Sequence, residues 1–319
     1  MTNITQELQD IFGEQMRENE PLSKHTNFRV GGPAKWFCEV DSADELIKAI
    51  NVLSGQVTYF ILGGGSNVLA SDEGFLGVVF KLTMRNIEIS GTTVKAGAGA
   101  LAVMLARTTV GAGLAGLEWA VSLPGTVGGM VRGNAGCFGG ETKDNLKSIE
   151  VLSDGKIKTM QSEELNFGYR HSAIKKSTDI VLTATFQLKV GDKDQLKARM
   201  NEILEKRKTS QPLTSGTAGC TFKNYETHKG DDMKMFAELG IPKEMLDARR
   251  ISSGWLIDRA ELKGEKIGGA SVSLEHGNFI INDGSATADQ IFQLISLVKT
   301  RVRDKFNIEL EEEIQYLGL

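Results

Sequence analysis

The sequence predicts a mixed fold of helices and strands in more than one domain, on three observations. The chain has 319 residues, against about 150 for a typical domain. Apolar residues recur at helical spacing near both ends of the chain, whereas residues 147–189 are rich in strand-forming side chains. The sequence holds 36 glycines and only 5 prolines, which indicates turns within ordered structure rather than a disordered tract.

Short helices and strands alternate through the first half of the chain. Ile4, Leu8, Ile11 and Phe12 share one helical face, and Ser42 is the expected N-cap of a helix over 42–53. We expect a loop with a short strand at 23–34. The remaining expected elements are strands at 36–40, 58–62, 78–82 and 92–96 and a helix at 101–110.

The second half begins with strands and ends with a long helix. Strands are expected at 149–152 and 180–188, around a Ser-Asp-Gly turn, and a helix at 192–208 ends in a basic run. The polar, glycine-containing segment 211–219 suggests a domain boundary. The last hundred residues are expected to hold helices at 255–260 and 287–306 and strands at 279–282 and 308–316.

Composition excludes several classes of protein. The formal net charge of −4 gives no indication of a nucleic-acid partner. The three cysteines, Cys38, Cys137 and Cys220, are odd in number and lack C-x-x-C spacing, which argues against a disulfide framework or a structural zinc site and fits a reducing cytoplasm. The first residues lack the features of a signal peptide, and no apolar run approaches the ~20 residues of a membrane span, so no membrane insertion is expected.

Two glycine-rich turns are the strongest chemical signal. Residues 61–69 read I-L-G-G-G-S-N-V-L directly after an apolar strand, and residues 125–136 read G-T-V-G-G-M-V-R-G-N-A-G. Such loops present several backbone N–H groups together, as a pyrophosphate cradle does. Two of them suggest one extended dinucleotide held at two points, although two tight turns without a ligand remain the alternative.

A third glycine pattern is a decoy. Residues 111–116 match G-x-G-x-x-G, but the nicotinamide-binding fingerprint requires a strand before it and a helix after it. Here a predicted helix comes first, so the pattern indicates a helix C-cap followed by a turn.

A series of motifs resembles one family. They read H-T-N-F-R-V-G-G-P-A (25–34), L-G-G-G-S-N-V-L (62–69), S-L-P-G-T-V-G-G (122–129), N-A-G (134–136), Y-R-H-S (169–172), A-G-C-T-F-K-N (218–224), G-W-L-I-D (254–258), L-K-G (262–264), I-G-G-A (267–270) and N-F-I-I-N-D (278–283). In this order, over about residues 20–318, they resemble the UDP-N-acetylenolpyruvoylglucosamine reductases, the flavoenzymes of peptidoglycan synthesis. The short interval between Arg170 and Lys206 is similar to that of the family's type II members.

The resemblance implies an α+β fold: a two-lobed FAD-binding domain of the vanillyl-alcohol-oxidase/PCMH type, followed by a C-terminal substrate domain. The implied FAD-binding domain spans 1–209, with lobes of roughly 1–85 and 86–209, and the implied substrate domain spans 210–319. FAD would be bound non-covalently, with NADPH as the reductant and UDP-N-acetylglucosamine enolpyruvate as the substrate. The implied flavin contacts are Gly63, Gly64, Gly65, Ser66, Asn67, Ser122, Gly125, Thr126, Gly128 and Gly129.

Two catalytic positions follow from matched motifs. Arg170 corresponds to the family's arginine, whose planar fork suits a carboxylate or a developing enolate. Glu313 corresponds to the glutamate in the family's L-E-P-E-V. Glu312 replaces the proline of that motif, so Glu311 is the alternative candidate for the catalytic glutamate. Without the resemblance, the three glutamates would be interpreted as a solvated acidic run.

The third catalytic position departs from the family. Where the family usually has a proton-donating serine, this chain has Cys220. A cysteine here could simply pack as a small apolar side chain. A thiol, with an ordinary pKa of about 8.5, is nevertheless a stronger acid than a serine hydroxyl, so we predict that Cys220 is the proton donor.

The resemblance also implies substrate contacts at Tyr169, Lys208, Asn224 and Lys263, although Lys208 could equally be an exposed lysine at a helix end. It implies no metal. Two other classes of function remain: a flavin oxidase of the same FAD-binding fold, and a non-catalytic protein that binds a flavin or a nucleotide sugar. The C-terminal motifs argue against a flavin oxidase. Arg170 and Glu313 argue against a non-catalytic binding protein, but Cys220 in place of the serine leaves that alternative open.

Overall fold

A computed structural model of the protein describes residues 4–212 and 215–319 and divides the chain into two compact units. The first unit comprises the residues up to Glu20, Pro33–Gly65 and Phe75–Thr209. The second comprises Pro21–Gly32, Ser66–Gly74 and Ser210–Leu319. The boundary expected at 211–219 includes residues 213 and 214, which lie outside the described residues. Neither unit is one continuous stretch of sequence.

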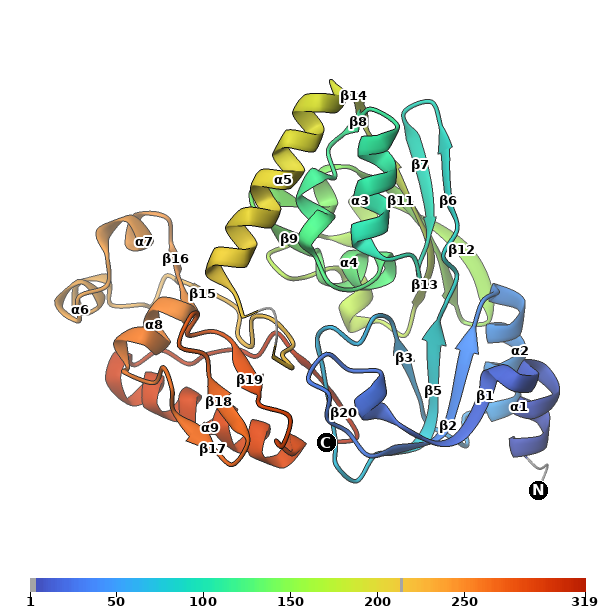
Figure 1. Cartoon of the computed structure of the whole chain (residues 1–319), viewed down its shortest axis with the longest axis horizontal. Helices are drawn as coiled ribbons and strands as arrows, with labels where there is room; N and C mark the ends of the chain where they lie inside the picture. The colour runs from blue at the N-terminus through green and yellow to red at the C-terminus, as the bar shows by residue number, and fades with distance from the viewer. Residues whose placement is uncertain (1–3, 213–214) are drawn as a thin grey trace. The chain divides into compact units, whose positions relative to one another are not determined.

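The first unit begins with a four-stranded sheet in the order β1-β2-β5-β3, in which β2 and β3 run parallel to β5. Helices α1 and α2 pack against each other and against β2 (Figure 1). The predicted N-cap is confirmed, because the Ser42 hydroxyl accepts from the Glu45 N–H at 3.3 Å. These elements are α1 Ile4–Phe12, β1 Met16–Pro21, β2 Pro33–Val40, α2 Ala43–Leu53, β3 Tyr59–Leu62 and β5 Phe75–Leu82.

The second sheet of this unit is antiparallel, in the order β12-β11-β13-β7-β6. Its strands are β6 Ile87–Ser90, β7 Thr93–Gly97, β11 Leu146–Ser153, β12 Lys156–Gln161 and β13 Ile180–Gln187. The prediction that the Ser-Asp-Gly turn separates 149–152 from 180–188 was wrong in one respect. The turn joins β11 to β12, a mostly exposed strand whose polar sequence K-I-K-T-M-Q carries little apolar signal.

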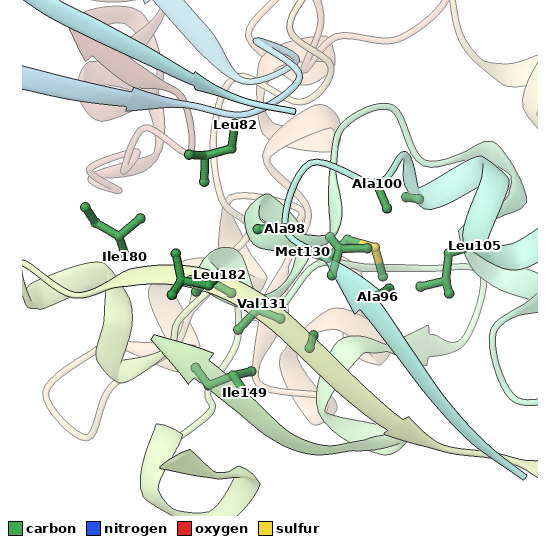
Figure 2. Packing of buried hydrophobic residues seen from close by; sticks show 14 of the residues in the cluster. Leu82, Ala96, Ala98, Ala100, Leu105, Met130, Val131, Ile149, Ile180 and Leu182 are labelled. Carbon is green, nitrogen blue, oxygen red and sulfur yellow. The ribbon is translucent and has the colours of Figure 1, made fainter. Parts of the chain in front are cut away.

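Three helices complete the first unit: α3 Ala102–Gly111, α4 Val127–Gly133 and α5 Lys193–Ser210. In α4, Met130 and Val131 pack against Ala96, Ala98 and Leu182 in the core beside the antiparallel sheet (Figure 2). The alanines that follow β7 allow the start of α4 to approach closely, and the Gly128 N–H donates to the Ala98 carbonyl at 2.9 Å. The remaining short strands are β8 Leu114–Ala115, β9 Gly136–Cys137, β10 Gly140–Glu141 and β14 Lys189–Val190.

The G-x-G-x-x-G pattern is a helix end, as predicted. Helix α3 ends at Gly111, and the Gly113 N–H donates to the Val110 carbonyl at 2.9 Å. Gly113 has φ +76°, a conformation that favours glycine, and the short strand β8 follows instead of a helix. The pattern therefore marks a turn.

In the second unit, the long helix α9 packs against the three-stranded antiparallel sheet β17-β18-β19 (Figure 1). The predicted apolar stripe of α9 is confirmed, because Ile291, Ile295, Val298, Val302 and Phe306 are all buried. The elements of the unit are β4 Val68–Ala70, β15 Tyr225–Glu226, α6 Met233–Glu238, α7 Lys243–Asp247, β16 Arg250–Ile251, α8 Ser253–Arg259, β17 Lys266–Ile267, β18 Ala270–Val272, β19 Ile280–Asn282, α9 Ala288–Phe306 and β20 Gln315–Leu317.

The expected strand at 308–316 is mostly absent. Only β20 forms, and it pairs in parallel with β4, a segment far earlier in the chain. Residues 308–314 are irregular apart from an isolated bridge between Glu312 and Phe222. The C-terminal end therefore reaches its place through contacts distant in sequence.

Across residues 4–212 and 215–319, no helix is long and apolar enough to cross a membrane. Within the same residues, no group of three or more His, Cys, Asp or Glu side chains is placed to hold a metal ion. The cysteines Cys38, Cys137 and Cys220 form no disulfide.

Candidate functional site

The two glycine-rich turns come together in the first unit. A Cβ on Gly64 would lie 2.9 Å from the Gly125 Cα atom, and a Cβ on Gly63 would lie 2.6 Å from the Thr126 Oγ1 atom. Gly65 and Gly125 have φ +63° and +118°, which L side chains rarely adopt. Glycine is therefore required for the turns to touch each other, and any side chain here would separate them.

Thr126 places an unused hydroxyl beside this contact. Its side chain is 5% exposed, and its Oγ1 atom is buried without a hydrogen-bond partner. A buried hydroxyl with no partner is unfavourable by about 1–3 kcal/mol unless a ligand or water satisfies it. The close-packed glycines and the unsatisfied donor form a site that suits the phosphate groups of a dinucleotide.

Helix α4 connects this site to Arg170. The helix begins after Thr126 and ends at Asn134, which is in the left-handed conformation at the C-cap. The Asn134 side chain donates to the Gly168 carbonyl and to the Glu141 carboxylate, both at 2.9 Å. Gly168 and His171 in turn exchange two backbone hydrogen bonds, so that Tyr169 and Arg170 form a tight turn. The motif N-A-G thus supports the arginine, a role that the sequence did not reveal.

Arg170 is held in a strained but well-supported position. Its backbone has φ +51°, which is uncommon for any residue with a side chain. Its Nη2 atom donates to the Gly136 carbonyl at 2.8 Å, and its backbone carbonyl accepts from Lys175 Nζ at 3.1 Å. The Arg170 guanidinium lies 5.2 Å from the centre of the Tyr169 ring. A non-glycine residue in a sparsely populated conformation is often found at a functional site.

Glu141, beside this turn, is held as a carboxylate. Its partial burial raises its pKa, but hydrogen bonds from Lys143 and Asn134 outweigh that effect, so the pKa lies below its ordinary value. The charge of Arg170 acts in the same direction. An anion near Arg170 and the Asn134 amide helps to fix both side chains.

The last two residues of the first glycine turn belong to the second unit, because the chain passes between the units after Gly65. The Asn67 side chain donates to the Glu313 carbonyl at 2.9 Å, and the Gln315 N–H donates to the Asn67 carbonyl at the same distance. Strands β4 and β20 continue this pairing. A residue predicted to contact FAD and a residue predicted to be catalytic are therefore neighbours.

Cys220 and Glu313 are neighbours as well. The Glu313 N–H donates to the carbonyl of Thr221, the residue after the cysteine, at 2.8 Å. On its other side, Cys220 forms an isolated bridge with Phe279. Two of the predicted catalytic residues are thus attached to one short segment, and Arg170 lies in the other unit.

The three glutamates 311–313 differ in their surroundings. Glu311 contacts Lys223 in an ion pair and is 71% exposed, and Glu312 pairs with Lys299 at 2.7 Å. Glu313 is half-buried, and its backbone joins Thr221 and Asn67. Burial and backbone contacts favour Glu313 over Glu311 as the functional residue.

The remaining predicted contacts vary in setting. The exposed Lys208 pairs with Glu205 at 2.6 Å on the surface of α5, whereas Lys263 pairs with Asp258 at 3.3 Å. The Asn224 Oδ1 atom accepts from the N–H and the hydroxyl of Ser253 at 3.2 and 3.3 Å. In the first unit, the Ser122 hydroxyl accepts from Arg207 at 3.4 Å, and Gly129 lies exposed in the first turn of α4.

Comparisons with known proteins identify both parts of the chain. Residues 34–161 match the model of a FAD binding domain, and residues 211–317 match that of the C-terminal domain of UDP-N-acetylenolpyruvoylglucosamine reductase. A UDP-N-acetylenolpyruvoylglucosamine reductase of Clostridium botulinum is 40% identical over 307 residues, covering 95% of this chain and 93% of that protein. One of Pediococcus pentosaceus is 37% identical and covers 99% of both.

A solved structure agrees with these matches. The crystal structure of the UDP-N-acetylenolpyruvylglucosamine reductase from Thermus caldophilus superposes with a TM-score of 0.76 at 35% identity, over 95% of this chain and 100% of that one. The family matches and this similarity confirm the predicted α+β fold class, with an FAD-binding domain and a reductase C-terminal domain.

Proposed function

Because the chain belongs to the UDP-N-acetylenolpyruvoylglucosamine reductase family, we propose that it reduces UDP-N-acetylglucosamine enolpyruvate to UDP-N-acetylmuramate. It is an FAD-dependent oxidoreductase with NADPH as the electron donor, and it acts in the synthesis of peptidoglycan precursors. The single observation that carries this function is the identity of 37–40% over nearly the whole chain, which includes both the flavin domain and the C-terminal domain.

The residues of the glycine turns fit the cofactor. The contact of Gly64 with Gly125 and the unsatisfied Thr126 hydroxyl suit the pyrophosphate of FAD, with backbone N–H groups as the expected donors. When bound there, FAD would supply the hydride-transfer chemistry between NADPH and the enolpyruvyl double bond. The motif resemblance supports a role in cofactor binding for Ser66, Asn67 and Ser122 as well.

Arg170 stabilises the negative charge that develops on the substrate. Hydride addition to the vinyl CH₂ carbon leaves an enolate on the enolpyruvyl carboxylate, and a planar guanidinium can donate two parallel hydrogen bonds to it. The support from Gly136 and Asn134 fixes the guanidinium before the substrate arrives, so little reorganisation is needed.

Cys220 and Glu313 complete the reaction. Cys220 donates its thiol proton to the α carbon of the enolate, which gives the saturated lactyl ether. Glu313 acts in its protonated form or through a shared proton, since a bare carboxylate would repel the enolate. Their attachment to one segment around Thr221 supports a joint role.

Residues of both predicted domains bind the substrate. Tyr169 lies next to Arg170, whereas Asn224 and Lys263 belong to the predicted substrate domain 210–319. Lys208, at the end of the predicted FAD-binding domain 1–209, would have to leave its pair with Glu205. The cytoplasm supplies both NADPH and nucleotide sugars, and it is the proposed location.

The visible spectrum of the purified protein tests this function against a flavin oxidase and against a non-catalytic binding protein. Under anaerobic conditions, NADPH should bleach the flavin bands, and the enolpyruvyl substrate should restore them. A flavin that only oxygen reoxidises would indicate an oxidase. A flavin that NADPH cannot bleach would indicate a binding protein.

A further inference from the structure

Both polar atoms of the Asn278 side chain bind the segment that carries Cys220. The residue is 3% exposed. Its Oδ1 atom accepts from the Phe222 N–H at 2.9 Å, and its Nδ2 atom donates to the Phe222 carbonyl at 2.8 Å. Nδ2 also donates to the Ser253 hydroxyl at 3.1 Å. One buried carboxamide thus satisfies both backbone groups of Phe222.

This side chain takes the place of a strand neighbour. The Thr221 N–H donates to the Asn278 carbonyl at 2.8 Å, and Cys220 bridges Phe279, but β19 begins only at Ile280. A carboxamide has the same donor and acceptor as a peptide group, so it can extend a hydrogen-bond ladder by one residue. The extension of the ladder from Thr221 to Phe222 therefore depends on one side chain.

The other edge of the same segment carries the glutamates. The Glu313 N–H donates to the Thr221 carbonyl at 2.8 Å, and the Lys223 N–H donates to the Glu311 carbonyl at 2.9 Å. Residues 220–223 are thus held between Asn278 on one side and residues 311–313 on the other. A shift of the Thr221–Phe222 backbone would move Cys220 and Glu313 relative to each other.

We propose that Asn278 is a positioning residue for proton delivery, because its carboxamide fixes the backbone from which Cys220 and Glu313 take their relative places. This inference rests on the proposed function. Asn278 is not expected to touch the substrate or the cofactor, and its effect is confined to the substrate half-reaction, in which the enolate is formed and protonated.

Asn282 provides a matched control in the same unit. It is 4% exposed, and its side chain is likewise hydrogen-bonded to backbone: Nδ2 donates to the Phe28 carbonyl at 2.8 Å, and Oδ1 accepts from the Gly284 and Ala286 N–H groups. None of these contacts involves residues 220–223. A general loss of stability should therefore be common to both asparagines, whereas a loss of proton delivery should be specific to Asn278.

The experiment compares Asn278→Asp, Asn278→Ser and Asn282→Asp as holoenzymes in stopped flow. Flavin reduction by NADPH should be unchanged in all three. Reoxidation by the enolpyruvyl substrate should slow on the order of 10- to 100-fold in the Asn278 variants only, as expected for a displacement of about 1 Å. Lower pH should partly restore Asn278→Asp, whose protonated carboxyl can again donate to the Phe222 carbonyl, but not Asn278→Ser.

Alkylation of Cys220 by iodoacetamide, followed by mass spectrometry, gives a readout that does not depend on turnover. Burial raises the pKa of Cys38 to about 12 and also raises that of Cys137, so Cys220 should be the cysteine that reacts. It should react faster in both Asn278 variants than in wild type or Asn282→Asp.

Equal reoxidation rates in Asn278→Asp and Asn282→Asp, or alkylation of Cys220 unchanged in both Asn278 variants, would overturn the proposal. A wild-type enzyme that fails to transfer hydride to the substrate would instead refute the proposed function. The alkylation comparison would still decide whether Asn278 fixes the position of Cys220.

Discussion

The side-chain amide of Asn67 donates a hydrogen bond to the backbone carbonyl of Glu313, with an N–O distance of 2.9 Å. Asn67 ends the glycine turn proposed to hold FAD, and Glu313 is proposed to act on the substrate. The contact gives the cofactor loop and the acidic segment a common anchor, which the pairing of β4 with β20 extends. The following predictions test the residues on both sides of it.

Gly64→Val should give a folded protein without bound FAD. The new Cβ would meet the Gly125 Cα atom at 2.9 Å, so the two glycine turns must separate. Gly111→Val is the control, because a Cβ there meets nothing within 4 Å. The absorbance ratio of flavin to protein after purification measures the effect, and full FAD occupancy in Gly64→Val would contradict the assignment.

Arg170→Lys should leave flavin reduction by NADPH near normal and slow reoxidation by the substrate on the order of 10²-fold, the usual loss for one oxyanion donor. Lysine keeps the charge but lacks the planar fork. Arg199→Lys, on the exposed face of α5, is the control and should change neither half-reaction. If Arg170→Lys reoxidised at the wild-type rate, Arg170 would be an ordinary surface residue.

Cys220→Ser should remain active, and the alkaline limb of its rate profile should move to higher pH. The donor must be protonated, so activity falls as the pH rises through its pKa, and a hydroxyl ionises at higher pH than a thiol. Cys220→Ala should reduce its flavin normally but fail to protonate the substrate carbon. Full turnover by Cys220→Ala, compared with Cys137→Ala as the control, would show that Cys220 only packs.

Glu313→Ala should slow the substrate half-reaction on the order of 10²- to 10³-fold, the range for loss of one donor at the reacting centre, because alanine lacks the carboxyl that donates to the enolate. Glu311→Ala should have little effect, because Glu311 is 71% exposed and pairs with Lys223. Single-turnover reoxidation separates the two. The reverse order of effects would move the catalytic role to Glu311.

His276 should make the protein less stable in mild acid. Burial, and then the charge of Lys263, lower the pKa of His276 in the folded state. The unfolded chain therefore binds more protons as the pH falls through about 6.5, so this residue's contribution is present above that pH and is lost below it. Urea unfolding of wild type and His276→Gln at pH 7 and pH 5 measures it. The variant should lose less stability, and equal losses would exclude His276 as the source.

Local signals predicted the helices well. In α9, the apolar stripe is accompanied by a capping box in which Thr287 accepts from the Gln290 N–H, so the start of the helix and its buried face are both set by neighbouring residues. The N-cap of α2 is local in the same way. Strands that depend on distant partners were harder: β1, M-R-E-N-E-P, is largely polar and was missed, and β20 was expected to be much longer than it is.

Within the candidate site, the contact between the two glycine-rich turns is the part that the sequence made predictable. The two turns could be recognised because close backbone approach permits no side chain, and the structure places Gly64 against Gly125. The support from Asn134 and Asn278 was not predictable, because a buried asparagine can bond to any backbone group that the fold brings near it. Nor could the sequence show that Ser66 and Asn67 belong to the second unit, which follows from the pairing of β4 with β20.

The discontinuous second unit has a consequence for synthesis on the ribosome. Segments Pro21–Gly32 and Ser66–Gly74 emerge early, yet their partners in β20 and in the core around α9 are translated last. Three side chains of this core therefore meet their final neighbours only after almost the whole polypeptide has been made: Phe28, Val30 and Leu69. A fragment limited to residues 210–319 would lack these side chains and the strand beside β20, so we expect it not to fold alone.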